Sequence, residues 1–283
     1  MSHVAIVTDS TADIPAELAR ELDIHIIPVR LNWGGRSLRD GVDIMPEEVY
    51  HRLREDRHLP TSSAPSVGDF LRVYAELSQE VEGILSIHLP PELSSVYNAA
   101  LTASQLVEDV PIRVIDCRTA AMGQGFVVLE AARIAAEGRD LRAVMERAQE
   151  VLSRVNVLAT LDTLEYLHRS GRVPGVAALI GSLLRINPIL YVEDGHAGVL
   201  ERPRTKNKAV RRMVEIMEER VSSSPVHVAV MQADALEEAE RLRDKMASRF
   251  NCAELLITEF TPVMGAHTDP GLLGVAFWGE GIQ

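Results

Sequence analysis

The chain has 283 residues, 46% of them hydrophobic, which is enough for a sizeable core in one large or two ordinary domains. Its formal net charge of −12 would repel a phosphate backbone, so the composition argues against nucleic acid as a partner. Only 4% of the residues are aromatic, so the core is aliphatic, which suits an aliphatic ligand and ordinary packing alike.

The cysteines and the N-terminal residues bear on where the protein works. Cys117 and Cys252 lie far apart and show neither a disulfide framework nor the spacing of a CxxC metal site. Residues 1–10 lack a basic segment followed by a long apolar run, so no targeting signal is expected. No run reaches the roughly 18 apolar residues that a membrane span requires. We therefore expect a cytoplasmic protein without an integral membrane segment.

In the first half of the chain, short β-branched segments alternate with helical patterns. The pattern predicts strands over residues 4–7, 25–29, 83–89 and 112–116. It predicts helices over residues 15–22, from Ser66 onward, and over about residues 94–107 and 122–137. The helix from Ser66 places Phe70, Val73, Tyr74 and Leu77 on one face. This alternation predicts an α/β fold with a parallel sheet covered by helices.

The pattern changes after a predicted helix over about residues 140–154 and a strand over residues 155–161. Two further strands flank Asp194-Gly195, which is a strong hairpin signal. Thr205 caps another helix, and strand-like runs follow over residues 226–231, 255–260 and 274–278. Hairpins mixed with crossovers predict a mixed sheet with helices on one face. We therefore divide the chain into a first domain over residues 1–158 and a two-layer α/β domain over residues 159–283.

Four polar clusters lie at predicted strand ends or helix starts, where open α/β folds bind their ligands. They cover residues 8–13, 61–66, 93–97 and 265–271. Hydroxyls at helix N-termini, together with unpaired N–H groups, bind a carboxylate or a phosphate well. Each hydroxyl can equally be a simple helix cap. The sequence alone does not show whether the clusters meet.

Two further residues have surroundings typical of a site. His267 stands in a glycine-rich turn, although most turn histidines are surface or capping residues. Gly171 is expected to end a short helix, so that Arg172 either neutralises a ligand or favours the helix C-terminus. No pair of residues has metal-ligand spacing, and no GxSxG, Walker A or GxGxxG motif occurs. These residues predict an anion-binding protein without metal or cofactor and leave the anion open.

Read in order, these segments resemble the DegV family, the fatty-acid-binding subunits of the bacterial fatty acid kinase system. The resemblance runs nearly from end to end. It rests on the order and spacing of Thr8-Asp9-Ser10 with Asp13, Asp40-Gly41-Val42-Asp43, Thr61-Ser62-x-x-Pro65-Ser66, Ser94 with Tyr97, Asp116, Leu164-x-Tyr166-Leu167, Gly171-Arg172-Val173, Asn187-Pro188-Ile189-Leu190, Arg204-Thr205 with Lys208-Ala209, and His267-Thr268-x-Pro270-Gly271.

The resemblance implies a two-domain fold, with a three-layer α/β/α domain that contains the parallel sheet and a smaller α/β domain. It also implies a tunnel for one palmitate-like fatty acid, whose carboxylate is held by Thr61 or Ser62, by Ser94 and by His267. Polar residues expected nearby are Thr8, Ser10, Arg172 and Thr268. The chain departs from the family pattern at Asp269, where the family has glycine, which would place a second carboxylate near the ligand's own.

The resemblance further implies that the protein is a carrier without catalysis, which presents the carboxylate to a separate kinase subunit. Burying about 14 methylenes at about 0.8 kcal/mol each contributes roughly 11 kcal/mol, which favours a tunnel over a surface groove. One alternative is a hydrolase or transferase on small anions, with Ser94 as nucleophile and His267 as base. Another is a sensor that binds lipid and reports it to a partner protein.

A basic run contrasts with the acidic composition. Six cations and no acidic residue occur between Arg202 and Arg212. A solvated helix face is one explanation. The other, favoured by the family-like motif within the run, is a docking surface for the kinase formed by Arg202, Arg204 and Lys208.

Overall fold

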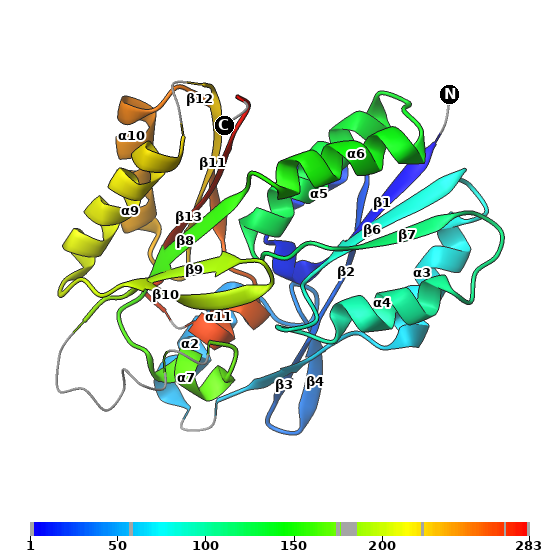
Figure 1. Cartoon of the computed structure of the whole chain (residues 1–283). Coiled ribbons are helices and arrows are strands. Elements are labelled where there is room, and N and C mark those ends of the chain that lie inside the picture. Colours follow the sequence, from blue (N-terminus) through cyan, green and yellow to red (C-terminus); the bar gives the residue numbers. More distant parts are fainter. Residues whose placement is uncertain are drawn as a thin grey trace.

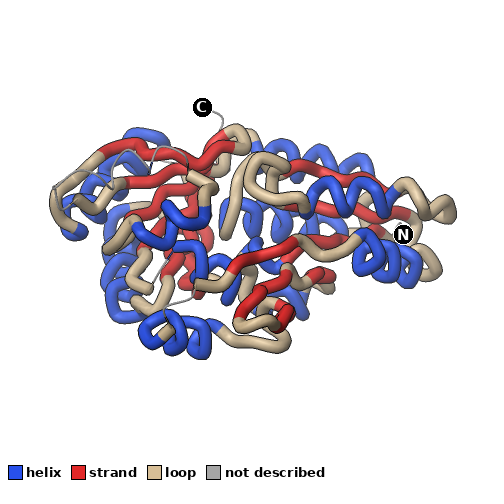
Figure 2. The backbone as a smooth tube through the Cα atoms, turned by 90° about the horizontal axis from the view of Figure 1, so that it is seen from below, coloured by secondary structure: helices blue, strands red, loops and turns tan. Residues whose placement is uncertain are grey.

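The computed structural model describes residues 3–56, 59–173, 176, 186–221, 224–268 and 270–281. Two sheets lie side by side, and a smaller group of strands and helices lies below them (Figure 1). Viewed from below, the same two groups of strands flank the centre of the molecule, with the N-terminus at the end of one of them (Figure 2). One hydrophobic cluster contains buried residues of both groups, such as Ile6, Val157 and Trp278, so the two pack together.

The first sheet is entirely parallel, with strand order β2-β1-β6-β7. Its strands are β1 (Val4–Asp9), β2 (Ile24–Ile27), β6 (Gly83–His88) and β7 (Ile112–Asp116). Every residue of β1 and β6 is buried, as expected where helices cover both faces. α5 (Met122–Ala136) and α6 (Leu141–Leu152) cover one face, while α3 (Val67–Leu77) and α4 (Val96–Ser104) cover the other (Figure 1). The expected α/β fold with a parallel sheet is confirmed.

The second sheet is mixed and has strand order β10-β9-β8-β13-β11-β12. Its strands are β8 (Asn156–Thr160), β9 (Ile189–Glu193), β10 (His196–Glu201), β11 (Val226–Gln232), β12 (Cys252–Glu259) and β13 (Leu273–Gly279). β11 and β12 pair parallel and the other neighbours pair antiparallel. α9 (Lys206–Arg220) and α10 (Leu236–Arg249) cover its outer face (Figure 1). The predicted hairpin turns at Asp194 and Gly195, which have φ angles of 50° and 81°.

β8 bears on where one domain ends and the next begins. The predicted division between residues 158 and 159 lies inside β8. All of that strand is part of the mixed sheet, since it pairs with β13 and β9. We therefore propose that the second unit begins before Asn156. The sequence pattern identified the strand but could not show which strands it pairs with.

A third sheet was not predicted from the sequence. It has strand order β4-β3-β5, is antiparallel, and consists of β3 (Arg30–Trp33), β4 (Arg36–Arg39) and β5 (Thr61–Ser63). Near it lie α2 (Pro46–Glu55), α7 (Glu165–Ser170) and α11 (Pro262–Thr268), and α11 contacts both of the other helices and β3. The remaining elements are η1 (Ser10–Ala12) and α1 (Ala16–Glu21), which follow β1. These short elements bring polar clusters from distant parts of the chain to one place.

Candidate functional site

A cavity lies between the parallel and mixed sheets. It holds about 990 Å³ of empty space, counted together with its opening to solvent. The part of this space that the centre of a water-sized sphere can occupy measures about 150 Å³. Its wall is mainly aliphatic and includes Leu93, Ala121, Val157, Ala159, Leu190 and Ala197. The aliphatic composition noted in the sequence therefore does more than fill the core, because part of it lines this cavity.

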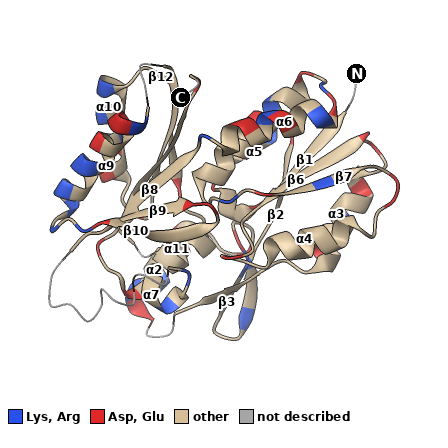
Figure 3. Ribbon diagram, in the orientation of Figure 1, with Lys and Arg blue, Asp and Glu red and all other residues tan. Residues whose placement is uncertain are grey.

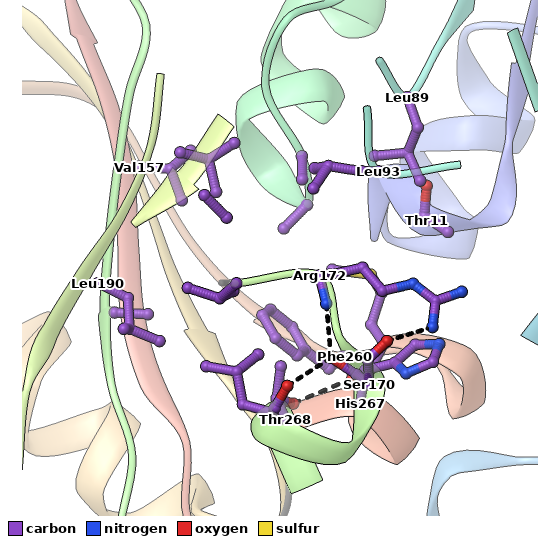
Figure 4. A pocket seen from close by; sticks show the side chains of 18 of the residues that line it. Thr11, Leu89, Leu93, Val157, Ser170, Arg172, Leu190, Phe260, His267 and Thr268 are labelled. Atoms are coloured by element: carbon purple, nitrogen blue, oxygen red, sulfur yellow. Dashed lines mark hydrogen bonds between the residues drawn. The ribbon is translucent and has the colours of Figure 1, made fainter. Parts of the chain in front are cut away.

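Polar side chains gather on one side of the cavity. Ser170, Arg172, His267 and Thr268 lie close together, whereas Val157 and Leu190 lie toward the mixed sheet (Figure 4). Ser62 and Ser94 also line the cavity. The Ser62 Oγ and His267 Nε2 atoms are 2.7 Å apart and share a hydrogen bond. An aliphatic cavity with polar groups on one side suits an amphiphile with a long apolar body.

The structure distinguishes Ser62 from Thr61, which the sequence could not. Both residues lie in β5, where successive side chains point to opposite sides of the strand. Thr61 is exposed, while Ser62 is half-buried and lines the cavity. Thr61 instead lines a neighbouring depression, which shares Ser170, Arg172 and His267 with the cavity.

Ser94 lies at the start of α4, as the sequence predicted. Its backbone N–H donates to the Pro90 carbonyl oxygen at 3.1 Å. Its Oγ accepts a hydrogen bond from the Val96 amide at 3.4 Å, so the hydroxyl serves partly as a helix cap. Within the described part of the chain, the Ser94 hydroxyl proton has no acceptor. Because Ser94 also lines the cavity, that proton is available to a ligand.

His267 is neutral at physiological pH. It lies in the last turn of α11 and is half-buried. Burial and the nearby positive charge of Arg172 lower its pKa to about 4. Arg172 itself is exposed and its Nη1 donates to the Ser170 carbonyl oxygen at 2.6 Å. Gly171 ends α7 with a left-handed conformation at φ 70°, as predicted from the sequence.

The remaining hydroxyls expected near the ligand differ in their placement. Thr8 and Ser10 are buried in the core and do not line the cavity. The Thr8 hydroxyl donates to the Ile87 carbonyl oxygen, and the Ser10 hydroxyl donates to Asp40. Thr11, from the same cluster, does line the cavity, and its hydroxyl donates to Asp9. The sequence identified the cluster, but nothing in it showed which hydroxyl faces the ligand space.

Two other predicted features complete the site. Thr268 is buried beside the cavity and its hydroxyl donates to the Met264 carbonyl oxygen at 3.0 Å, so it is satisfied within α11. Asp269, where the chain departs from the family pattern, lies outside the described residues. Ser170 and Tyr191 line the cavity but were not expected from the sequence.

The basic run lies along the start of α9, on the outer edge of the mixed-sheet unit (Figure 3). Lys206, Arg211 and Arg212 form ion pairs with acidic neighbours. Arg202, Arg204 and Lys208 are exposed and have no acidic partner among the described residues. The three cations proposed for docking are therefore those whose charge is not already neutralised by a neighbour.

Two features are absent from the residues that the structure describes. No group of three or more His, Cys, Asp or Glu side chains there is arranged to hold a metal ion. No helix there has the length and apolar character needed to cross a membrane.

Comparison with known proteins gives consistent matches along the whole chain. The model of a family described as uncharacterised, the DegV family, matches residues 3–280. A DegV domain-containing protein of Halalkalibacterium halodurans is 36% identical over 282 residues, covering 99% of this chain and 100% of that protein.

Solved structures show the same similarity. A DegV family protein from Thermus thermophilus, described by its fatty acid binding, has a TM-score of 0.92 at 30% identity and covers 98% of this chain and 99% of its own. DegV of Bacillus subtilis, described as a fatty acid binding protein, has a TM-score of 0.91 at 29% identity. The match covers 99% of this chain and 100% of that protein.

Proposed function

The chain belongs to the DegV family, and from this premise we propose that it binds one long-chain fatty acid in the cavity between its two large sheets. The observation that carries the proposal is the aliphatic cavity with Ser62, Ser94 and His267 in its wall. The relatives from T. thermophilus and B. subtilis, which share this fold, are described as binding fatty acids. A palmitate-like chain would lie along the aliphatic wall, with its carboxylate at the polar side.

The proposed head-group contacts use the tautomer of neutral His267 that carries its proton on Nε2. In this tautomer Nε2 donates to Ser62 Oγ, which leaves the Ser62 hydroxyl proton free to donate to a carboxylate. The Ser94 hydroxyl is a second donor. Hydrogen bonds from neutral hydroxyls hold a carboxylate without the desolvation cost of a buried ion pair.

The same arrangement supports a role as carrier for a partner kinase. A carboxylate held by neutral donors keeps the negative charge with which it attacks a nucleotide's γ-phosphate. In this proposal the protein positions the carboxylate and a separate kinase subunit transfers the phosphoryl group to give an acyl phosphate. The protein itself has no catalytic residue and needs no cofactor, and it works in the cytoplasm.

Two alternatives predict different behaviour. A hydrolase or transferase was expected to pair Ser94 with His267, but His267 hydrogen-bonds to Ser62. Among the described residues no carboxylate hydrogen-bonds to His267, so a Ser62–His267 pair lacks the third group that commonly orients a catalytic histidine. A sensor would bind lipid equally well and would differ only in its partner.

We expect the purified protein to carry about one straight-chain fatty acid per chain. The full chain is extracted with organic solvent and the extract is analysed by mass spectrometry, with protein quantified in the same sample. Delipidated protein is then incubated with palmitate and its thermal melting is followed, because a ligand that binds only the native state raises the melting temperature. Absence of an acyl chain from the extract, together with no uptake of palmitate, would contradict the carrier proposal.

The docking surface gives a second prediction. Arg202→Glu with Arg204→Glu should leave fatty-acid content unchanged but slow acyl-phosphate formation by the cognate kinase at least tenfold at low salt, because electrostatic steering acts on the association rate. The matched control is Arg113→Glu with Arg139→Glu, which changes the net charge equally at two exposed positions on the parallel-sheet unit. Equal slowing in both double variants would attribute the effect to net charge and would refute docking at Arg202 and Arg204.

A further inference from the structure

The helix that carries His267 is held at its opposite end by two buried carboxylates. The Thr261 amide donates to Asp13 Oδ1 at 2.9 Å, just before α11 begins. The Val263 amide, in the first turn, donates to Asp40 Oδ1 at 2.8 Å. Asp13 follows β1 of the parallel sheet and η1, Asp40 follows β4 of the small antiparallel sheet, and both acids are almost inaccessible to solvent, at 3% and 2% exposure. Two contacts across the molecule therefore hold the start of α11.

The two carboxylates are themselves held in place. Asp40 Oδ2 accepts the Ser10 hydroxyl at 2.5 Å, and Ser10 Oγ in turn accepts the Val29 amide at 3.1 Å. Asp13 has a left-handed conformation with φ 53°, directly after η1. The segments after β1 and β4 thus form a rigid support against which the first turn of α11 rests.

Burying these two carboxyl groups lowers the stability of the native state. Burial raises the pKa of Asp40 to about 6 and raises that of Asp13 well above its ordinary value. Asp13 Oδ2 is buried without a hydrogen-bond partner among the described residues. A carboxyl group whose pKa is raised in the native state lowers stability as pH rises from its ordinary pKa to the raised one. The two buried acids therefore do not serve to stabilise the native state. A role in positioning α11 accounts for their presence.

A small shift of α11 would also shift His267 in the head-group site. α11 has seven residues, so His267 lies only about one turn beyond Val263. Gly265 packs so closely on the ring of Tyr50 in α2 that a Cβ atom there would lie 2.7 Å from the ring. The helix is therefore confined from the side as well as from its first turn, and His267 Nε2 comes within 2.7 Å of Ser62 Oγ.

We propose that Asp13 and Asp40 are positioning residues of the head-group site, which anchor the first turn of α11 and thereby set the hydrogen bond between His267 and Ser62. The effect on fatty acids rests on the function proposed above, whereas the effect on His267 does not. Neither acid lines the cavity, so both act through the helix and not through contact with the ligand.

The pKa of His267 in the ligand-free protein reports the anchoring directly. It is measured by an NMR titration of the imidazole, assigned by comparison with His267→Gln. In Asp40→Ala and in Asp13→Ala the helix start is released and His267 becomes more hydrated, so we expect its pKa to rise from about 4 toward 6.5. The charged and titratable side chains that line the depression beside this imidazole are Arg169, Arg172 and Tyr166, which these variants leave unchanged.

Two further variants separate anchoring from general stability. Asp40→Asn keeps an oxygen acceptor for the Val263 amide, so the His267 pKa should stay near its parent value while the cost of burying a charge disappears. Asp43→Ala removes an exposed acid of the same loop that pairs with Arg39, and it should leave His267 unchanged. Asp13→Ala gives an independent result if Asp40→Ala does not fold. An unchanged His267 pKa in a folded alanine variant, or an equal shift in Asp43→Ala, would overturn the inference.

Fatty-acid release provides the functional readout. In Asp40→Ala the dissociation rate of palmitate should rise about tenfold, the effect of losing a hydrogen bond to a charged group, and Asp40→Asn should restore it. Combining Asp40→Ala with His267→Gln should add little to either change alone, since both act through one contact. Full additivity would overturn the inference. If the parent protein binds no palmitate, the proposed function fails, while the His267 titration still decides the anchoring.

Discussion

Replacing Ala197 with phenylalanine is expected to abolish fatty-acid loading. Ala197 is half-buried in β10 and lines the cavity together with aliphatic residues such as Leu93 and Leu190. A ring at this position would occupy space that the acyl chain needs. Excluding about seven methylenes at about 0.8 kcal/mol each would remove roughly 6 kcal/mol of binding free energy, which is a loss of about four powers of ten in affinity.

The measurement is the acyl content of the purified variant, followed by titration of delipidated protein with palmitate. Ala253→Phe is the matched control, because Ala253 is exposed on β12 and does not line the cavity. It should load as the parent does. The melting temperature of each ligand-free variant shows that it is folded. Loading of folded Ala197→Phe at the parental level would place the acyl chain somewhere other than this cavity.

Of the substitutions proposed for this protein, His88→Leu is expected to cause the largest loss of stability. Asp9 and His88 are both fully buried, and His88 Nδ1 lies 2.8 Å from Asp9 Oδ2. His88 Nε2 hydrogen-bonds to Ser86, which also accepts the Tyr74 hydroxyl. Removing one partner of a buried pair leaves an uncompensated charge, so the free energy of unfolding should fall by about 3–5 kcal/mol at pH 7.

The pH dependence of this loss follows from Asp9. Burial opposes ionisation of Asp9, but the hydrogen bond and charge of His88, together with hydrogen bonds from Thr11 and Gln124, outweigh it and hold the pKa of Asp9 below its ordinary value. In the parent, this contribution is present above the ordinary pKa of aspartate and is lost as pH falls through the lowered native pKa. Without His88 the native pKa of Asp9 rises, so the variant loses stability as pH rises from about 4. The difference between parent and variant should therefore grow from pH 4.5 to pH 7.

Chemical denaturation at the two pH values provides the test. The control is His25→Leu in β2, since His25 is one-third exposed and lies 4.0 Å from the exposed Asp23. An exposed pair of this kind contributes about 0–1 kcal/mol. Adding Asp9→Leu to His88→Leu should recover part of the stability, because it removes the unpaired charge. Similar losses of stability in His25→Leu and His88→Leu would show that the buried pair contributes no more than the exposed one.

Several parts of the fold were readable from the sequence because they depend on neighbouring residues. Strands β1 and β6 appear as short apolar runs, and the turn at Asp194 and Gly195 requires two positive φ angles that Asp-Gly readily adopts. The left-handed Gly171 at the end of α7 is another local signal. By contrast, β5 consists of Thr-Ser-Ser, which has no apolar pattern and becomes a strand only through pairing with β3. The small sheet was therefore missed.

The sequence by itself determined the order of most elements, the α/β class, the family and the set of polar clusters, because each is written in the types and spacing of nearby residues. The tertiary structure decided which members of those clusters meet. Ser62 and His267 are 205 positions apart, and Asp13 lies 248 positions from the amide that it accepts. Contacts over such separations depend on how sheets and helices pack. Local patterns could therefore identify Ser62 and Asp13 as candidates, but they could not show that Ser62 lies in the cavity wall or that Asp13 holds the helix of His267.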